Sequence, residues 1–377
     1  PGTHPLLGQR VRSALKHKEI LFETQISAQS PAYLADYRVQ QTVMLPATAY
    51  IEMALAAGAA VDQIGTADGL ALADLTFPQA LVLPEDGSKT LQCVVTPPAA
   101  PLAATPPPYA FQLFSLADDE WVLHAGGTVQ RRPSDSASAA TITRQTLQAG
   151  CPQAHSIADH YQKLATQGLT YGERFRVVTQ LWLGPDAAFG QIHVPQPLVT
   201  PTTYLHPVLL DSCFQILGAA LPAEEMGWRY RIAGLAALQL HRRAQPAATC
   251  FYGHAVVRGK EGDETLLADL HLLDEAGVLA AITGLILKRT AHQPVNDSYS
   301  AVNGVTAMAS FRQQLAATPA AEQQALLTSH LRSQLATVLG LDEPERIGLR
   351  QGLFDLGLDS LLSIALRNRL QASLGQP

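Results

Sequence analysis

The chain has 377 residues, with 26 Lys and Arg against 32 Asp and Glu, so its formal charge is −6. Nucleic-acid binding requires clustered cations, and a bilayer-spanning helix requires roughly 18–20 consecutive apolar residues. The sequence contains neither pattern, which argues against a nucleic-acid-binding protein and against a membrane protein. Apolar residues make up 47% of the chain, as expected for a folded protein of two or three domains.

Four cysteines lie far apart in the sequence, at Cys93, Cys151, Cys213 and Cys250, without a C-x-x-C pair. This spacing predicts neither a disulfide framework nor a zinc ribbon. The histidines His155 and His160 are five residues apart, which is not the i, i+4 spacing of a helical metal pair. We therefore expect no metal site, and a reducing, cytoplasmic location fits the cysteine pattern.

The first 290 residues are dominated by short strand-like runs separated by turn residues, which is typical of an antiparallel sheet. Asp274-Glu275-Ala276-Gly277 is a hairpin signal between two of these runs. The expected strands are 20–27, 70–83, 90–97, 109–117, 121–131, 175–184, 187–195, 236–243, 250–259 and 265–273.

Two helical stretches interrupt the strands, at 47–61 and 208–221, and Pro46 and Pro207 precede them. Proline is favoured at a helix start because the missing N–H has no partner there. Both stretches are apolar around most of their circumference, which predicts burial against a sheet. Similar strand sequences begin at Val122 and Val278, roughly 160 residues apart, so we predict a duplicated α+β fold. Its halves are about 1–135 and 155–290, and in each a sheet wraps a buried helix.

Residues 291–319 show little periodicity and are predicted to be a linker. From residue 320 the pattern becomes helical and ends near Gly340. The predicted helix carries leucine and valine at helical spacing, at Leu326, Leu327, Leu331, Leu335, Val338 and Leu339. A separate helical unit, 320–377, is therefore expected.

Within that unit stands the segment Gly352-Leu353-Phe354-Asp355-Leu356-Gly357-Leu358-Asp359-Ser360-Leu361-Leu362. It resembles the acyl carrier protein of a modular polyketide synthase. The resemblance implies that Ser360, at a helix N-terminus that can accept a phosphodiester, carries 4′-phosphopantetheine. The alternative is that Asp359 and Ser360 only cap a helix. Because the family's carrier domain continues through further helices, 320–377 is interpreted as its N-terminal part, a truncated carrier.

Four separated motifs in the first 290 residues resemble a polyketide synthase dehydratase domain, which has a double hot-dog fold. Their order and spacing carry the resemblance. The motifs are His4-Pro5-Leu6-Leu7-Gly8, Tyr33-Leu34-Ala35-Asp36-Tyr37-Arg38-Val39 running into Leu45-Pro46, Tyr171-Gly172-Glu173-Arg174-Phe175, and His206-Pro207-Val208-Leu209-Leu210-Asp211-Ser212-Cys213-Phe214-Gln215.

The family removes water from a 3-hydroxyacyl thioester with a histidine as base and an aspartate that protonates the departing hydroxyl. The resemblance assigns the aspartate role to Asp211. Gln215, four residues later and on the same helix face, can hydrogen-bond to it or to the leaving oxygen. Apolar neighbours predict a raised pKa for Asp211, which suits a general acid. A purely structural buried carboxyl remains the alternative.

The family's base motif is His, three residues, Gly, four residues, Pro, and the matching positions here are Tyr37, Gln41 and Pro46. A phenol has a pKa of about 10 against about 6.5 for imidazole, so only ~0.1% is ionised at pH 7. Dehydration should therefore be slowed by at least the ~10²–10⁴ that a positioned base contributes. Tyr37 could instead donate a hydrogen bond to a carbonyl or an enolate.

By resemblance, Tyr171, Pro46 and His206 lie along the substrate channel. The hydroxyl of Tyr171 would contact polar atoms of the acyl chain. The equal alternative is that Tyr171 is a core aromatic residue with a satisfied hydroxyl. His206 belongs to the family's His-Pro motif and is interpreted as structural.

Three functions remain open besides impaired dehydration. They are dehydration with an altered base, another reaction of an acyl thioester such as double-bond migration, conjugate addition or ring closure, and a non-catalytic scaffold. Only ~30 linker residues separate the two units, so the ketoreductase that usually lies between dehydratase and carrier is absent from this stretch. The resemblance implies a carrier-bound polyketide intermediate, the other megasynthase domains and a second copy of the chain as partners.

Overall fold

The computed structural model describes residues 4–12, 18–61, 69–98, 108–117, 120–131, 142–196, 198, 200, 202–222, 225, 229–262, 264–290 and 319–339. The chain divides into two compact units, Pro1–His292 and Gln293–Pro377. Ser360 and the rest of the carrier motif lie outside the described residues, as does nearly all of the predicted linker 291–319.

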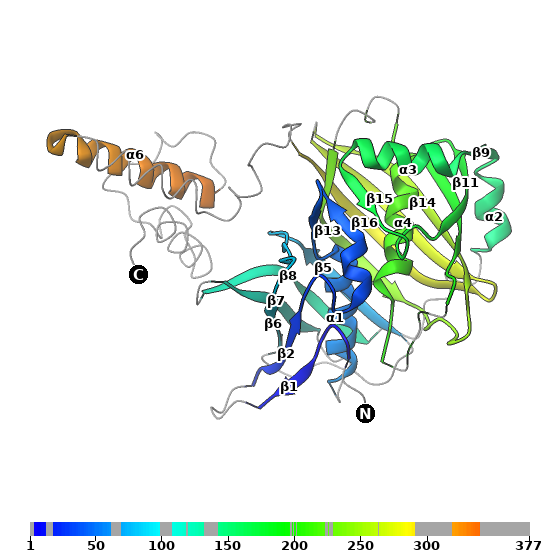
Figure 1. The fold of residues 1–377 in the computed structure, drawn as a ribbon, viewed down its shortest axis with the longest axis horizontal. Coiled ribbons are helices and arrows are strands. Elements are labelled where there is room, and N and C mark those ends of the chain that lie inside the picture. Colours follow the sequence, from blue (N-terminus) through cyan, green and yellow to red (C-terminus); the bar gives the residue numbers. More distant parts are fainter. Residues whose placement is uncertain are drawn as a thin grey trace. The chain divides into compact units, whose positions relative to one another are not determined.

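In the described residues of its first half, unit 1 has the α-helix α1 among β-strands (Figure 1). Its elements are β1 (Gln9–Val11), β2 (Ile20–Ile26), a 3-10 turn (Ala32–Asp36), β3 (Tyr37–Val39), β4 (Thr42–Val43), α1 (Ala47–Ala59), β5 (Leu70–Thr76), β6 (Lys89–Thr96), β7 (Tyr109–Ala117) and β8 (Glu120–Arg131).

The second half follows the same plan, with two further short helices before its central helix. Its elements are α2 (Arg144–Ala149), β9 (Gln153–His155), α3 (Ile157–Thr166), β10 (Leu169–Tyr171), β11 (Val178–Gly184), β12 (Ala187–His193), α4 (Pro207–Ala220), β13 (Arg229–Leu240), β14 (Cys250–Glu261), β15 (Thr265–Asp274) and β16 (Gly277–Thr290).

Strand order confirms the duplication predicted from the sequence. The main sheet runs β1-β2-β6-β7-β8-β5 in the first half and continues as β13-β16-β15-β14-β12-β11-β9 in the second. The two halves meet where β5 pairs antiparallel with β13, with Leu72 opposite Leu238. The expected two sheets are therefore joined edge to edge into one, which leaves neither central edge strand unpaired. The predicted hairpin joins β15 to β16, with Gly277 at φ +119°.

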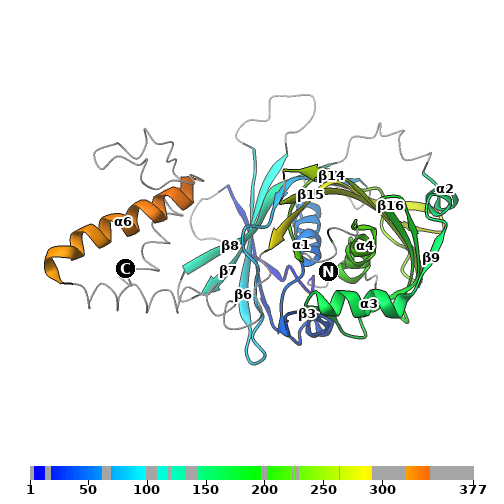
Figure 2. The same cartoon turned by 90° about the horizontal axis from the view of Figure 1, so that it is seen from above.

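The curved sheet encloses α1 and α4, which contact each other (Figure 2). Every residue of α1 from Thr48 to Gly58 is buried. Small residues allow the close approach: a Cβ added to Gly58 would lie 2.4 Å from Cγ2 of Val129, and one added to Gly253 would lie 2.5 Å from Cδ1 of Ile216. The all-round apolar sequence of both helices is thus explained by sheet on several sides.

Unit 2 contains α6 (Ala320–Leu339), which begins and ends close to the bounds predicted from the leucine spacing. Within the described part of the chain, none of the helices combines the length and the apolar character needed to cross a membrane.

Candidate active site at the junction of the two halves

A small second sheet brings residues of both halves together. Its strand order is β10-β3-β4, and β3 pairs antiparallel with β10 so that Tyr37 stands directly opposite Tyr171. Their ring centroids are 5.8 Å apart in an edge-on arrangement. Two motifs that lie over 130 residues apart in the sequence are therefore joined by backbone pairing.

The turn between β3 and β4 contains Gln41, the position at which the family's base motif has glycine. Gln40 and Gln41 both have positive φ, 51° and 68°. Two successive left-handed residues form the type I′ turn that suits a two-residue hairpin, and glycine adopts this conformation without steric cost. Gln41 therefore adopts a left-handed conformation that glycine favours, at a cost of about 1–2 kcal/mol for a non-glycine residue.

Asp36 fixes the segment that follows Tyr171. Its backbone carbonyl accepts a hydrogen bond from Gly172 N (2.7 Å), and its Oδ2 accepts one from Arg174 N (2.8 Å). A Cβ on residue 172 would lie 2.4 Å from Cγ of Asp36, so only glycine fits there. Phe175 is fully buried, and its ring centroid lies 5.5 Å from that of Tyr37. The five-residue segment from Tyr171 to Phe175 thus supplies the aromatic rings that pack around Tyr37.

Asp211 lies on α4 and is 2% exposed. Burial raises the pKa of Asp211 from 3.8 to about 7, although a hydrogen bond from Gln215 opposes the shift. Gln215 Nε2 donates to Asp211 Oδ2 at 2.9 Å and to the carbonyl oxygen of Phe175 at 3.0 Å. A carboxyl group that is half protonated near pH 7 can both give and take a proton.

Tyr171 connects Tyr37 with Asp211. Burial raises the pKa of Tyr171 well above 10, and the charges of Asp211, Tyr37 and Tyr161 add to that effect in this order. Tyr171 is therefore within electrostatic range of Asp211 while its ring contacts Tyr37. Of the predicted site residues, Tyr37, Tyr171 and Gln215 each contact Phe175, and Asp211 joins them through its hydrogen bond from Gln215.

His206 caps α4, because its Nδ1 accepts a hydrogen bond from Val208 N at 3.2 Å. The neutral ring must then carry its proton on Nε2, so His206 is an N–H donor and has no lone pair to offer as a base. Burial and the nearby His4 lower the pKa of His206 to about 4. Its ring packs against Tyr33, with centroids 4.9 Å apart. His206 therefore caps α4 in this geometry, and its place along a substrate channel stays a prediction.

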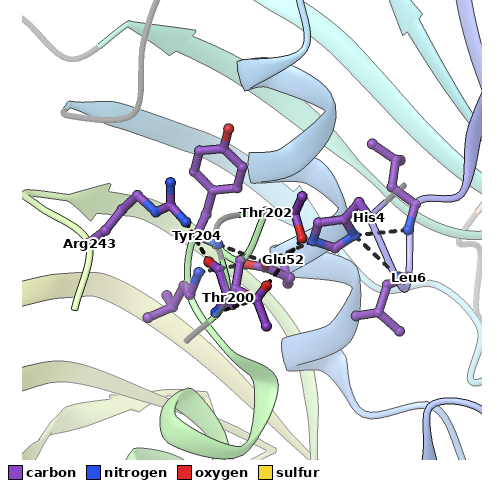
Figure 3. A network of polar contacts seen from close by, with 10 residues as sticks. His4, Leu6, Glu52, Thr200, Thr202, Tyr204 and Arg243 are labelled. Atoms are coloured by element: carbon purple, nitrogen blue, oxygen red, sulfur yellow. Dashed lines mark hydrogen bonds and ion pairs between the residues drawn. The ribbon is translucent and has the colours of Figure 1, made fainter. Parts of the chain in front are cut away.

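His4 is held in the same tautomer. Its Nδ1 accepts from Leu6 N and Leu7 N, at 3.2 and 3.0 Å, so its Nε2–H donates to Oε1 of Glu52 at 2.9 Å. Glu52, 1% exposed on α1, also accepts from Tyr204 N (2.8 Å) and Leu205 N (2.6 Å). Figure 3 shows this network between α1, the N-terminal segment and the loop that leads into α4. The carboxylate of Glu52 therefore holds the loop just before α4.

His160 is fully buried on α3, and neither of its ring nitrogens has a hydrogen-bond partner within the described residues. Burial, followed by the charges of Lys163 and His155, lowers its pKa to about 4. Its Cε1 lies 3.9 Å from the position of a Cβ on Gly218. The ring also interacts with the backbone of Gln215, so this imidazole packs against α4 one to two turns beyond Asp211.

Pro46, predicted to line the channel, is the N-cap residue of α1, with φ −68° and ψ 149°. The structure places it at the end of the β3–β4 segment, where it starts the helix that carries Glu52. Across the described ranges, no group of three or more His, Cys, Asp or Glu side chains is arranged to hold a metal ion.

Sequence reasoning missed two polar residues of this region, Tyr161 and Glu52. Tyr161 lies on α3, which the sequence analysis did not predict, and its hydroxyl donates to Gln215 Oε1 at 2.9 Å. The available signals were Ser156, whose side chain caps α3, and a lone glutamate within the otherwise apolar α1. A charged residue at the centre of a buried helix needs partners, and that could have identified Glu52.

Family comparisons cover nearly the whole chain. Residues 4–115 match the family model described as polyketide synthase dehydratase domain, and residues 139–297 match that of the polyketide synthase dehydratase N-terminal domain. Residues 329–377, which include Ser360, match the phosphopantetheine attachment site. This last match implies a phosphopantetheine prosthetic group on the second unit.

Curated relatives are much longer proteins. The chain is 30% identical over 226 residues to mycoketide-CoA synthase of Mycobacterium tuberculosis, covering 59% of this chain and 5% of that protein. It is 31% identical over 219 residues to the pikromycin polyketide synthase component PikAII of Streptomyces venezuelae, covering 57% of this chain and 6% of that protein. The chain therefore spans only a small part of the length of these relatives.

Solved structures give the fold directly. The dehydratase domain from the CurF module of curacin polyketide synthase is 33% identical, with a TM-score of 0.68, and the match covers 77% of this chain and all of that domain. An inactive mutant of the CurK dehydratase, with a histidine replaced by phenylalanine, is 30% identical with a TM-score of 0.66, over 77% of this chain and 99% of that one. The predicted double hot-dog fold is thus confirmed. The chain belongs to the dehydratase-domain family of modular polyketide synthases, and a phosphopantetheine-binding carrier domain follows the dehydratase domain.

Proposed function

We propose that this domain binds carrier-delivered 3-hydroxyacyl thioesters but that its dehydration is impaired or lost. The observation that carries the proposal is the position of Tyr37. Backbone pairing of β3 with β10 holds this residue opposite Tyr171, beside the group that contains Asp211, at the place where the family motif has its histidine.

Elimination requires two proton transfers. A base takes the proton from C2, the C2–C3 double bond forms as the C3–O bond breaks, and an acid protonates the departing hydroxyl, which leaves as water. Asp211 has the burial and the pKa of about 7 that suit the acid. An un-ionised phenol has no proton-accepting strength comparable to imidazole, so the C2 proton lacks an acceptor at Tyr37.

The neighbouring imidazoles do not replace the base. His206 and His4 both use Nδ1 as an acceptor for backbone N–H groups, so each presents only an N–H. His160 is fully buried against α4 one or two turns beyond Asp211. The related CurK dehydratase supports the same reasoning, because its forms with His replaced by Phe or Asp replaced by Asn are both described as inactive.

Turnover of synthetic thioesters tests the proposal. The parent chain, Tyr37→His, and Tyr37→His combined with Asp211→Asn are each incubated with a 3-hydroxyacyl pantetheine thioester and with its 2-enoyl counterpart. Loss or gain of water is followed by mass. We expect an inert parent, a gain of about 10² or more in the Tyr37→His variant, and loss of that gain in the double variant. Turnover by the parent at the rate of Tyr37→His would overturn the proposal.

The intact hydrogen bonding around Asp211 favours a second function. Asp211, Gln215 and Tyr161 form a continuous hydrogen-bonded chain although the base position is changed. With Tyr37 donating a hydrogen bond to the thioester carbonyl, Asp211 would serve as a proton shuttle in double-bond migration, conjugate addition or ring closure. Conversion of a 2-enoyl to a 3-enoyl thioester by the parent, abolished by Asp211→Asn, would identify it. If no variant reacts or binds thioester, a scaffold role remains.

The proposed setting is the cytoplasm, with the carrier-bound intermediate and other megasynthase domains as partners. Attachment of phosphopantetheine to Ser360 and association of two copies of the chain belong to the same proposal. Mass spectrometry after treatment with a phosphopantetheinyl transferase, with Ser360→Ala as the control, tests the attachment residue.

A further inference from the structure

Tyr161 lies on α3 and packs against α4, the central helix of the second half. It is 7% exposed, and the guanidinium of Arg176 lies over its ring, 4.6 Å from the centroid. Its hydroxyl donates to Oε1 of Gln215 at 2.9 Å and accepts from Val178 N at 3.4 Å. The hydroxyl therefore accepts one hydrogen bond, from a backbone N–H, and donates one, to the side-chain oxygen of Gln215.

The amide of Gln215 is fully committed by this contact. Its oxygen accepts from Tyr161, and its two N–H protons go to the carbonyl oxygen of Phe175 (3.0 Å) and to Oδ2 of Asp211 (2.9 Å). A flipped amide would place its oxygen against the Phe175 carbonyl and its NH₂ against the hydroxyl of Tyr161. Since Gln215 is 1% exposed, water cannot relieve those mismatches. Only one orientation of the amide is compatible with the site.

We propose that Tyr161 is a positioning residue that, through Gln215, directs the proton of Asp211 onto Oδ1. Oδ2 already accepts an N–H from Gln215, and a protonated Oδ2 would direct its O–H toward that donor. When Asp211 is neutral, its proton therefore resides on the other oxygen. This inference rests on the proposed function only in treating Asp211 as the acid of the site.

Among the described residues, Tyr161, Tyr171 and Cys213 interact electrostatically with Asp211, and burial is the first cause of the raised pKa in all three. The positive charge of Arg176 acts on Tyr161. The phenols and the thiol are neutral near pH 7, so the Gln215 hydrogen bond is the directional influence on the carboxyl. Without Tyr161 the amide can turn, and its oxygen can accept from a protonated Oδ2, which favours neutral Asp211.

Titration of Asp211 in the full chain tests the proposal without any turnover. The chain is labelled with ¹³C at the Asp side-chain carboxyl, and the Asp211 signal is identified by its absence in Asp211→Asn. We expect Tyr161→Phe to raise the pKa of Asp211 by about 0.5–1 unit, which corresponds to one hydrogen bond of about 1 kcal/mol. In a Gln215→Met background, Tyr161→Phe should cause no further shift, because the effect passes through the amide.

Tyr252→Phe is the matched control. Tyr252 is 6% exposed, and its hydroxyl is hydrogen-bonded to Arg144 and Glu275. It lies on β14 next to Gly253, whose Cβ would meet Ile216 and Cys213 of α4, so Tyr252 faces away from α4. An unchanged Asp211 titration in Tyr161→Phe, or an equal shift in the control or in the Gln215→Met background, overturns the proposal.

A second measurement applies if Tyr161→Phe does not fold. In the parent chain both side-chain N–H protons of Gln215 should exchange slowly with solvent, because both are hydrogen-bonded inside the fold. Rapid solvent exchange of either proton would show that the amide is not held in this orientation and would contradict the assignment of the proton to Oδ1.

Discussion

Replacing Asp211 with Asn should stabilise unit 1 in a pH-dependent way. The carboxyl has a pKa of about 7 when folded and 3.8 as its ordinary value, so the folded state binds more protons between these pH values. This contribution is fully present below pH 3.8 and is lost as the pH rises to about 7. The difference, at about 1.4 kcal/mol for each pKa unit, corresponds to about 4 kcal/mol.

Asn retains an oxygen that can accept from Gln215 Nε2, and its new NH₂ adds a cost that is the same at every pH. We therefore expect the free energy of unfolding of Asp211→Asn, relative to the parent, to rise by about 4 kcal/mol between pH 4 and pH 8. Urea unfolding followed by tryptophan fluorescence measures it, because Trp121, Trp182 and Trp228 all belong to unit 1.

Asp186→Asn is the control, because it removes a carboxylate from an exposed turn. A stability difference between Asp211→Asn and the parent that is constant from pH 4 to pH 8 would refute the reasoning. So would a difference that becomes more unfavourable with rising pH, since it would mean that the folded state favours ionised Asp211.

Three further substitutions test the geometry around the site. Gln41→Gly should raise the free energy of unfolding by about 0.5–1 kcal/mol, because it relieves the left-handed backbone, whereas Gln41→Ala should not. Gly172→Ala should lower it by about 1–3 kcal/mol, and Asp36→Ala in the same chain should cost less than it does alone. Glu52→Gln should lower the free energy of unfolding by about 2–4 kcal/mol, because an NH₂ group replaces one of the two carboxylate oxygens that accept from three N–H donors. Equal stability would contradict the network of Figure 3. Urea unfolding at one pH measures all three.

Much of the fold could be predicted because its signals are local. The hairpin at Asp274–Gly277, the apolar helices after Pro46 and Pro207, and the roughly 160-residue repeat are all readable from short segments. The pairing of β5 with β13 could not be predicted, since the sequence contains no signal for which strands become neighbours across the two halves. For that reason two separate sheets were expected, whereas the main sheet of the structure is continuous.

The candidate site shows the same limit. The resemblance to the family motifs indicated Tyr37, Asp211 and Gln215 as candidate site residues, but the side-by-side position of Tyr37 and Tyr171 depends on a long-range strand pair. The tautomers of His4 and His206 follow from backbone N–H groups that only the fold brings to Nδ1. Ser156 could have indicated where α3 starts, but the sequence has no signal that pairs Tyr161 of this helix with Gln215.

Hydrogen exchange at the substrate's C2 tests the central claim most directly, because it isolates the proton that a base must remove. A 3-hydroxyacyl pantetheine thioester is incubated in D₂O with the parent chain, Tyr37→Phe and Tyr37→His, and deuterium at C2 is measured by mass spectrometry. We predict exchange only with Tyr37→His, and equal, uncatalysed rates with the parent and Tyr37→Phe. Exchange catalysed by the parent and abolished in Tyr37→Phe would show that the phenol itself removes the proton, contradicting the account.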